Sequence, residues 1–194
     1  MRVRDENKIE SIREKGLEMI VEQGFDGFSM GKLAKAANVS PATLYIYFKN
    51  REDLLNQLYM EVHKKFAEVA LKDFNPDLSL KEGLKLQWKN RLKFITRYPV
   101  HFKFQEQFRN TPSYHSGNQL SEFKENMKQF VMNAIKRGEM KKMEPEIFWA
   151  LAYGPFYFLV KFHLQGKSHM NTSFKLNDAL LEKTLDKVIN ALKK

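Results

Sequence analysis

Residues 29–51 read SMGKLAKAANVSPATLYIYFKNR, and this stretch decides the fold. It holds four lysines and arginines and no acid, although apolar residues recur in it at helical spacing. Ser29 and Ser40 stand where the N-caps of helices belong. Pro41 fits the first turn of a helix, because its missing N–H would have no partner there. The stretch therefore predicts two short helices that begin after the two serines.

The turn between these helices is Ala37-Asn38-Val39. Asparagine tolerates the left-handed backbone conformation that a tight helix ending requires. Because the connection is so short, the helices cannot lie side by side and must cross. This pattern predicts a helix-turn-helix, whose second helix presents its N-terminal residues to base edges in the major groove of DNA.

The second helix of this motif has a core side and a side left for DNA. Leu44 and Phe48 are four residues apart and are expected to face the core. Thr43 offers a methyl group to thymine and a hydroxyl group to a base or a phosphate. Hydroxyl-bearing and basic residues would hold phosphates, and the absence of acids avoids repulsion of the DNA backbone. The predicted DNA-binding residues are Ser29, Lys32, Ser40, Ala42, Thr43, Tyr45, Tyr47, Lys49 and Arg51.

The reading positions of this helix carry no Arg, Asn or Gln, the residues that make bidentate contacts with bases. Base discrimination should therefore depend on methyl contacts, water and DNA shape. On composition alone, a plain helical hairpin whose aromatic residues form a core remains an alternative.

Composition restricts the class of protein. The 194 residues include no cysteine, which excludes disulfides and thiolate metal sites and favours a cytoplasmic location. The net charge is +10, yet residues 1–64 hold ten basic and ten acidic residues, so the excess lies downstream. A solvated, lysine-rich surface explains that excess. The alternative is a non-sequence-specific protein that binds DNA or a membrane surface through its basic C-terminal part.

No strand alternation persists along the chain, and helical spacing recurs between short turns. We predict an all-α fold: an N-terminal three-helix helix-turn-helix module (residues 1–50) followed by a C-terminal helical bundle for ligand binding and dimerisation (residues 51–194). Besides the two short helices, helices are expected near residues 5–23, 50–72, 79–97, 100–108, 119–137, 145–165 and 174–192. The total is about nine helices.

Residues 9–55, with GFDGFSMGKLAKAANVSPATLYIYFKNREDLL at their centre, resemble the DNA-binding domain of the tetracycline-repressor (TetR) family of bacterial regulators. The resemblance implies a homodimer that binds a pseudo-palindromic operator, most often as a repressor released by a small ligand in the C-terminal bundle. It also implies DNA contacts at seven of the nine residues above, Ser40 and Ala42 being the two added from the motif's geometry. Gly31 departs from the family pattern, because some relatives carry a base-reading side chain there.

The stretch from Ile147 to Phe162 is apolar on nearly all sides of its predicted helix. Such a helix must be buried on more than one side, so we expect one side to face the core and another a second subunit. Its uncharged run, residues 147–160, is shorter than a membrane span, and Gly154-Pro155 should kink it. The predicted dimer-interface residues are Phe148, Phe156, Leu176, Leu180, Thr184 and Val188.

Aromatic residues are concentrated in the middle of the chain. Core packing accounts for many of them, but large rings with a few polar tips also suit a cavity for a bulky hydrophobic or aromatic ligand. His63 lies on the helix that connects the two predicted domains, where a bound ligand would influence both. The predicted ligand-binding residues are His63, Trp88, Phe102, Phe104, Phe108, Phe123, Trp149, Tyr153 and Tyr157.

Catalytic motifs are missing from the sequence. It has no Ser-His-acid elbow, phosphate-binding loop or zinc signature, and its five histidines share no metal-ligand spacing. We therefore predict no enzyme activity, no catalytic residue, no metal and no cofactor.

Overall fold

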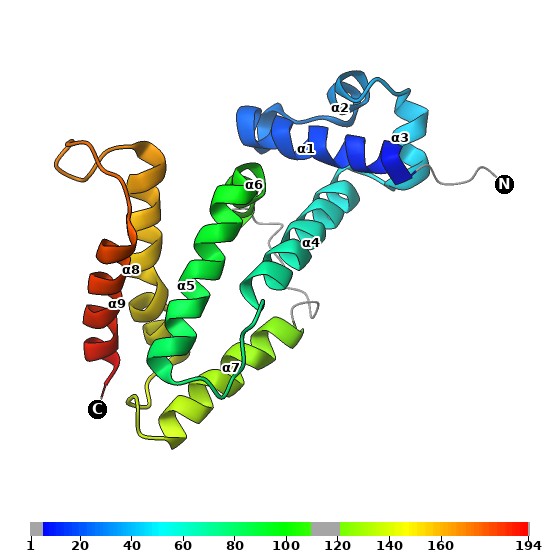
Figure 1. Ribbon diagram of the computed structural model, residues 1–194. Coiled ribbons are helices and arrows are strands. Elements are labelled where there is room, and N and C mark those ends of the chain that lie inside the picture. The colour runs from blue at the N-terminus through cyan, green and yellow to red at the C-terminus, as the bar shows by residue number, and fades with distance from the viewer. Residues whose placement is uncertain (1–5, 110–120, 194) are drawn as a thin grey trace. The chain divides into compact units, whose positions relative to one another are not determined.

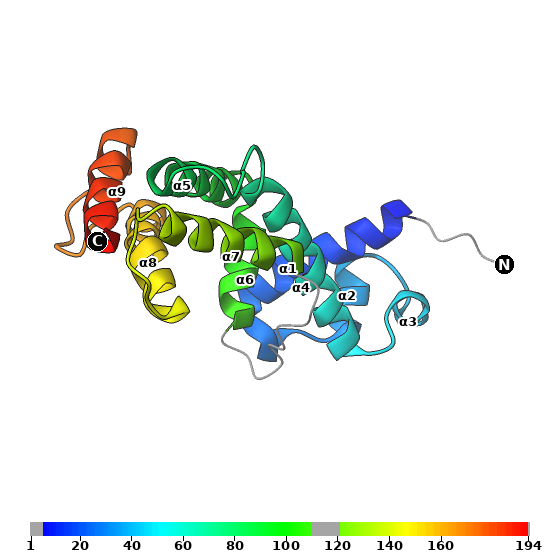
Figure 2. The same ribbon diagram turned by 90° about the horizontal axis from the view of Figure 1, so that it is seen from below.

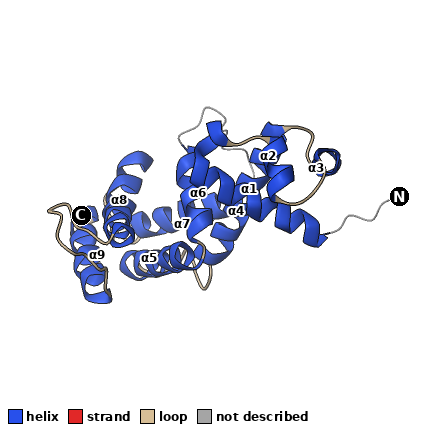
Figure 3. Cartoon of the chain, turned by 90° about the horizontal axis from the view of Figure 1, so that it is seen from above, coloured by secondary structure: helices blue, strands red, loops and turns tan. Residues whose placement is uncertain are grey.

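A computed structural model describes residues 6–109 and 121–193 of the chain (Figure 1). The regular elements of these residues are all helices (Figure 3). The only β pairing among the described residues is an isolated bridge between Lys167 and Ser173. The predicted all-α fold is confirmed. The helices are α1 (Glu6–Gly27), α2 (Met30–Ala36), α3 (Pro41–Tyr47), α4 (Arg51–Ala70), α5 (Leu80–Arg97), α6 (Pro99–Arg109), α7 (Ser121–Lys136), α8 (Pro145–Gln165) and α9 (Asp178–Leu192).

The described residues form two compact units. Unit 1 consists of residues 6–67 and 94–109, and unit 2 of residues 68–93 and 121–193. Most of α4 and all of α6 thus belong with the helix-turn-helix, because α6 packs against α1. The division into functional domains at residues 1–50 and 51–194 stays a prediction, since packing does not assign function.

In unit 1, α1 buries an apolar stripe that includes Ile9, Ile12 and Ile20. A Cβ atom at Gly16 would lie 3.2 Å from a methyl carbon of Leu58, so this position allows close packing of α1 on α4. The regular helix breaks at Gly24, where φ is 72°. That break lies one residue beyond the predicted helix end, and the helical assignment then resumes for a last turn.

The caps of the short helices explain where they begin. Ser29 Oγ accepts a hydrogen bond from Lys32 N (3.2 Å), and Ser40 Oγ accepts one from Thr43 N (3.1 Å). Asn38 has φ 52°, the left-handed conformation predicted for the turn. The predicted caps and turn are therefore confirmed, and α2 and α3 pack against each other as a helix-turn-helix.

The start of α4 follows the same rule. Asn50 Oδ1 accepts a hydrogen bond from Asp53 N (2.8 Å), which makes Asn50 the N-cap. The core of unit 1 lies between α1, α4 and α6, and the ring of Tyr59 stacks on that of Phe108 with centroids 4.3 Å apart. This core supports the helix-turn-helix from one side.

Unit 2 is built on α5, α7, α8 and α9. The views of Figures 1 and 2 show α8 and α9 side by side, and these helices are in contact. Trp88 Nε1 donates a hydrogen bond to the carbonyl oxygen of Ala152 (2.9 Å), which ties α5 to α8. A Cβ atom at Gly83 would lie 2.2 Å from the ring of Phe130, so the approach of α5 to α7 requires glycine there.

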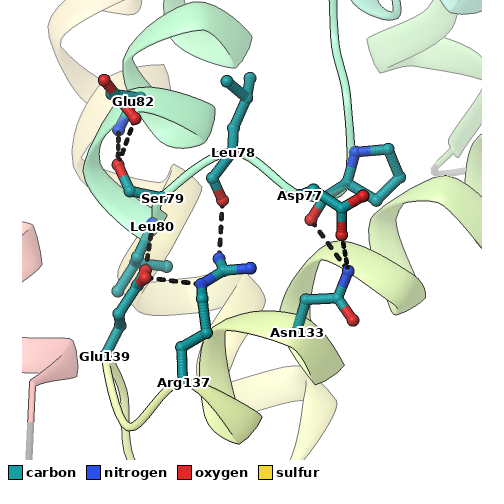
Figure 4. A network of polar contacts seen from close by, with 9 residues as sticks. Asp77, Leu78, Ser79, Leu80, Glu82, Asn133, Arg137 and Glu139 are labelled. Carbon is teal, nitrogen blue, oxygen red and sulfur yellow. Dashed lines mark hydrogen bonds and ion pairs between the residues drawn. The ribbon is translucent and has the colours of Figure 1, made fainter.

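The turn before α5 is held by α7 and the residues after it (Figure 4). Arg137 Nη2 donates to the carbonyl oxygen of Leu78 (2.7 Å), and Asn133 Nδ2 donates to Asp77 Oδ1 (2.7 Å). Glu139 Oε2 accepts from Leu80 N, while its other oxygen receives Arg137 Nε (2.6 Å). The hydrogen bond from Arg137 is the main cause that lowers the pKa of Glu139, so this carboxylate is ionised. The network orders the start of α5.

One C-terminal expectation needs correction. The last helix begins at Asp178, four residues later than predicted, because Asn177 caps it by accepting from Leu180 N (2.9 Å). The preceding residues form a tight hairpin in which Ser168 N donates to Thr172 O (2.8 Å). In α8 the helical assignment continues through Pro155, and the kink expected at Gly154-Pro155 stays a prediction.

Candidate nucleic-acid interface and ligand site

Helix α3 has two different sides. Leu44 and Phe48 are buried in the core of unit 1, as predicted. Tyr45 and Ile46 lie on the other side, with 57% and 54% of their surfaces exposed. Since two large side chains stay in water while their neighbours form the core, the fold holds an outward-facing helix with an apolar and aromatic surface.

The N-terminal end of α3 is polar and open. Ser40 and Ala42 are exposed, and Thr43 is half-buried. The hydroxyl oxygens of Ser40 and Thr43 are 2.9 Å apart, so the two groups share a hydrogen bond. This bond restrains the Thr43 side chain, so the predicted contact to a base would be made by a pre-positioned group.

The basic residues around α3 have different surroundings. Lys49 is exposed, and its backbone N–H donates to Asp53 Oδ2 (2.8 Å). Lys32 is exposed and its Nζ donates to the carbonyl oxygen of Gly27 (2.8 Å). Of the other predicted contacts in this region, Ser29 is exposed and Tyr47 is half-buried. Each of these side chains lies at the surface, where a phosphate would meet it.

Arg51 has an internal role that the sequence did not show. Its Nη2 donates to the carbonyl oxygen of Phe25 (2.6 Å), and its guanidinium carbon lies 5.9 Å from the ring centroid of Phe28. The side chain thus joins the start of α4 to the last turn of α1 and to Phe28, which lies between α1 and α2. We therefore add a stabilising role to the phosphate contact predicted for Arg51.

The predicted ligand residues fall into two separate groups. His63, Phe102, Phe104 and Phe108 belong to unit 1, and the other five belong to unit 2. In unit 1 the rings of Phe104 and Phe108 are fully buried against each other and Phe25, with centroid distances of 5.6–6.3 Å. These two rings are part of the unit's core, and Phe102 is half-buried.

His63 forms a buried polar pair. Its Nε2 lies 3.2 Å from Gln105 Nε2, and both side chains are buried. The imidazole ring also lies against Tyr59, with centroids 4.2 Å apart. Gln105 was missed by sequence reasoning, because a polar residue among the aromatic residues of α6 reads as a surface position.

In unit 2, four of the five predicted ligand residues gather around one cation. The guanidinium of Arg91, only 3% exposed, lies 4.2 Å from the ring centroid of Tyr153. The rings of Phe123 and Trp149 lie 5.6 Å and 5.9 Å from it. Arg91 Nη1 donates to the hydroxyl oxygen of Tyr157 (2.9 Å). Trp88, the fifth residue, is buried against Phe156.

The electrostatics of this cluster favour a charged Arg91 and a neutral Tyr153. Burial works against the charge of Arg91, but Tyr157 and Tyr153 support it, and the pKa of Arg91 lies above its ordinary value. Burial raises the pKa of Tyr153, and Arg91 only partly opposes this. Near neutral pH the cluster therefore holds a positive charge next to the protonated hydroxyl group of Tyr153.

Arg91 was also missed from the sequence, although a pattern could have revealed it. The buried side of α5 includes Leu84, Trp88, Arg91 and Ile95, which follow one another at intervals of three or four residues. An arginine in such an apolar stripe carries a buried charge, and charged side chains are almost never fully buried unless they are paired.

A surface cavity of about 260 Å³ lies between α5 and α9. Trp88, Leu181 and Leu185 form its apolar wall, and Lys85 pairs with Glu182 beside it. Of the predicted ligand residues, Trp88 alone lines this cavity.

The predicted dimer residues are partly interior. Phe148 and Phe156 are buried within unit 2, where their rings belong to the chain's own core, and their place in a dimer interface stays a prediction. Leu176 and Val188 are also buried, whereas Leu180 and Thr184 are half-buried on α9.

The exposed apolar side of α8 was not resolved by sequence reasoning. Phe158 is 62% exposed, and the other large exposed side chains are Ile147, Trp149, Leu151 and Leu164. By length and composition, α8 is the one helix of the described chain that is apolar enough to cross a membrane, and 28% of its most apolar window is buried. The uncharged run 147–160 was predicted to be too short for a membrane span, and the length and composition of the whole helix do not support that prediction.

Comparison with known proteins agrees with this architecture. Residues 12–58 match the bacterial regulatory proteins of the tetR family, and residues 80–192 match the tetracyclin repressor-like C-terminal domain. An uncharacterized HTH-type transcriptional regulator from Haemophilus influenzae is 33% identical over 96 residues, 50% of this chain and 51% of that protein. The fatty acid metabolism regulator protein of Bacillus subtilis is 37% identical over 79 residues, 41% of each chain. The chain thus spans about half the length of these relatives or less.

Solved structures cover the whole fold. A TetR family transcription regulator from Marinobacter aquaeolei VT8 has a TM-score of 0.78 at 29% identity, with 99% of this chain and 98% of that chain covered. A TetR-family transcriptional regulator from Haemophilus influenzae has a TM-score of 0.79 at 25% identity, with both chains fully covered.

The fold and the site define a transcriptional regulator that binds DNA through a helix-turn-helix. The chain belongs to the tetracycline-repressor (TetR) family, since the matched regions include more than half of it and cover both its DNA-binding and its C-terminal parts. This family consists of transcription regulators.

Proposed function

We propose that the protein is a cytoplasmic, homodimeric repressor that binds a pseudo-palindromic operator and is released by a small, mostly hydrophobic ligand bound in unit 2. The observation that carries this proposal is the outward side of α3, where exposed Tyr45 and Ile46 lie in a stretch without acids. A negatively charged groove would accept such a surface, because nothing on it repels phosphate.

Different side chains would contact the bases and the phosphates of the DNA. Thr43 and Ala42 would meet base edges at the leading end of α3, with methyl groups suited to thymine. Lys49 and Lys32, which are exposed, would hold phosphates and set the register without reading sequence. Specificity would therefore rest on few apolar contacts, on water and on the shape of the DNA.

A homodimer would explain α8. Its exposed apolar side chains form an unfavourable surface in water, and α9 lies beside it with Leu180 and Thr184 half-buried. Two copies of this helix pair would make an isologous four-helix interface. Such an interface would also set the spacing of the two α3 helices, which must reach half-sites about one DNA turn apart.

The ligand would act by shifting a population. A ligand that binds more tightly to the conformation with mis-spaced α3 helices lowers operator affinity, and the operator lowers ligand affinity by the same factor. The aromatic cluster of unit 2 supports a hydrophobic ligand, as does the similarity to a protein named for the regulation of fatty acid metabolism.

Selection of bound DNA fragments tests the DNA-binding part of this proposal. The wild-type protein should enrich one palindromic sequence, and Thr43→Ala should relax the base preference within each half-site. Lys49→Ala should weaken binding to all sequences evenly and reduce its salt dependence. Even enrichment of all sequences by the wild-type protein would instead favour the non-specific binder that the net charge of +10 permits.

Binding to membranes is the second function with an observation in its favour, since α8 is long and apolar enough to span one. Two measurements on the purified protein separate the two functions: light scattering, which gives the oligomeric state, and co-sedimentation with anionic vesicles. A stable dimer that does not co-sediment with anionic vesicles supports the repressor, and a monomer that does so supports a membrane-associated protein.

A further inference from the structure

Two rows of opposite charge run along α5 and α9. The residues of each row are four positions apart, so they share one side of their helix. The rows are Lys81, Lys85 and Lys89 on α5 and Asp178, Glu182 and Asp186 on α9. Lys81 Nζ lies 2.7 Å from Asp186 Oδ1, and Lys85 pairs with Glu182. Because one step forward on α5 matches one step back on α9, the same register sets Lys89 opposite Asp178 for a third pair.

The third pair is not formed. Lys89 and Asp178 are exposed, and among the residues that the structure describes neither side chain has an ion-pair or hydrogen-bond partner. The cavity of about 260 Å³ between α5 and α9 lies at this point, and both residues line it. The cavity therefore carries an unpaired ammonium group from α5 and an unpaired carboxylate from α9.

The apolar wall of this cavity consists of Trp88, Leu181 and Leu185, which are all buried. The indole N–H of Trp88 already donates to the carbonyl oxygen of Ala152, so this ring has no polar atom left for a ligand. Cavities that hold drug-sized ligands measure about 300–1,000 Å³, so this one suits a smaller molecule.

We propose that the cavity binds a free α-amino acid with a large apolar side chain. Its carboxylate pairs with Lys89 and its ammonium group with Asp178, while its side chain packs on the apolar wall. The charged residues that line the cavity are two lysines and two acids, so a neutral dipolar molecule suits them better than an ion does. An anion would meet the like charge of Asp178, and a cation that of Lys89.

This site goes beyond the proposed function, because Trp88 alone among the predicted ligand residues lines it. The test uses three probes that share a phenyl group: L-phenylalanine, 3-phenylpropanoate, which lacks the ammonium group, and 2-phenylethylamine, which lacks the carboxylate. The full chain has two tryptophans, so Trp149→Phe leaves Trp88 as the only one, and its fluorescence reports on the apolar wall. Calorimetry of the wild-type protein checks the same affinities. We expect L-phenylalanine to bind about threefold or more tightly than either analogue, since exposed charge pairs are individually weak.

Two neutral substitutions separate the two charges. Asp178→Asn should remove the preference for L-phenylalanine over 3-phenylpropanoate, and Lys89→Gln should remove the preference over 2-phenylethylamine. The controls Glu146→Gln and Lys183→Gln remove the same charges from exposed positions that do not line the cavity, so both preferences should stay. All four variants should melt as the wild type does, because each loses only an exposed charge.

The inference is overturned if L-phenylalanine does not bind up to its solubility limit, or if either analogue binds as tightly as L-phenylalanine. It is also overturned if the control variants change the preferences as much as the cavity variants do. Operator binding is measured separately, so the loss of a preferred operator would refute the repressor and leave this ligand site standing.

Discussion

The two helices α3 and α8 both expose large apolar side chains, but they do so in opposite settings. On α3, Tyr45 and Ile46 lie among hydroxyl groups and lysines, in a stretch with no acid. On α8, Phe158 and Leu151 belong to a helix that is apolar on most sides. Exposed apolar side chains alone therefore do not identify the binding partner, whereas the charges of the neighbouring residues do.

This difference in setting corresponds to different partners. A DNA groove is lined by phosphates and contains thymine methyl groups, so it accepts isolated apolar side chains with a basic rim. A second subunit offers a continuous apolar surface, so it suits a helix without a polar rim. The predictions that follow separate these two kinds of exposure.

The largest effect is expected from two neighbouring phenylalanines of α8. Phe156→Ala should lower the free energy of unfolding by about 3–5 kcal/mol, because it empties part of the core of unit 2. Phe158→Ala should leave the stability of the monomer nearly unchanged and weaken the dimer. Urea unfolding at low protein concentration and sedimentation velocity measure the two quantities. Equal destabilisation by both would show that α8 is not exposed as described.

The matching pair on α3 is Leu44 and Ile46. Leu44→Ala should cost about 2–5 kcal/mol of stability, because its side chain is fully buried. Ile46→Ala should change the stability by less than about 0.5 kcal/mol and act on DNA binding instead. Thermal melting with and without the selected operator distinguishes the two outcomes.

A smaller effect is expected from the cap of α3. Ser40→Ala removes the hydrogen bond to Thr43 N and should cost about 1 kcal/mol, whereas Ser40→Asp should keep the cap. Ser40→Asp places a negative charge at the DNA side, so it should weaken operator binding even though the fold is retained. Operator affinity that follows the stability of these variants would contradict the predicted interface.

The smallest effect concerns pH and unit 1. Burial, helped by Lys65, lowers the pKa of His101 below its ordinary value of 6.5. Below that pH the unfolded chain binds a proton that the folded chain resists, so stability falls as the solution becomes more acidic. His101→Gln should reduce the loss of melting temperature between pH 7.5 and pH 5.5. A larger loss in the variant would contradict this sign.

The helix-turn-helix was predictable because its determinants are local. Ser29, Ser40 and Asn50 cap helices through their own next turn, and Asn38 needs only its neighbours to adopt its turn conformation. The orientation of α8 was not predictable, because apolar residues on all sides of a helix do not show which side is buried. The buried side could have been that of Phe156 or that of Phe158.

The ligand site was predictable only in part. The aromatic residues of α7 and α8 were identified from composition, but the cation at their centre comes from α5 and depends on packing between distant segments. Likewise, the assignment of His63 and Phe104 to unit 1 and of Trp149 to unit 2 follows from contacts that no local pattern encodes. Arg51 was predicted from the sequence to contact a DNA phosphate, but its hydrogen bond to the carbonyl oxygen of Phe25 could not be predicted.

The most direct test of the account measures the affinity of the selected operator for Ile46→Glu by fluorescence anisotropy, with Lys142→Glu as the control. Both variants add negative charge at exposed positions, and only the first does so on α3. We expect Ile46→Glu to lose operator affinity by about a hundredfold or more with an unchanged melting temperature, and Lys142→Glu to bind nearly as the wild type does. Undiminished binding by Ile46→Glu would show that α3 does not enter the DNA groove.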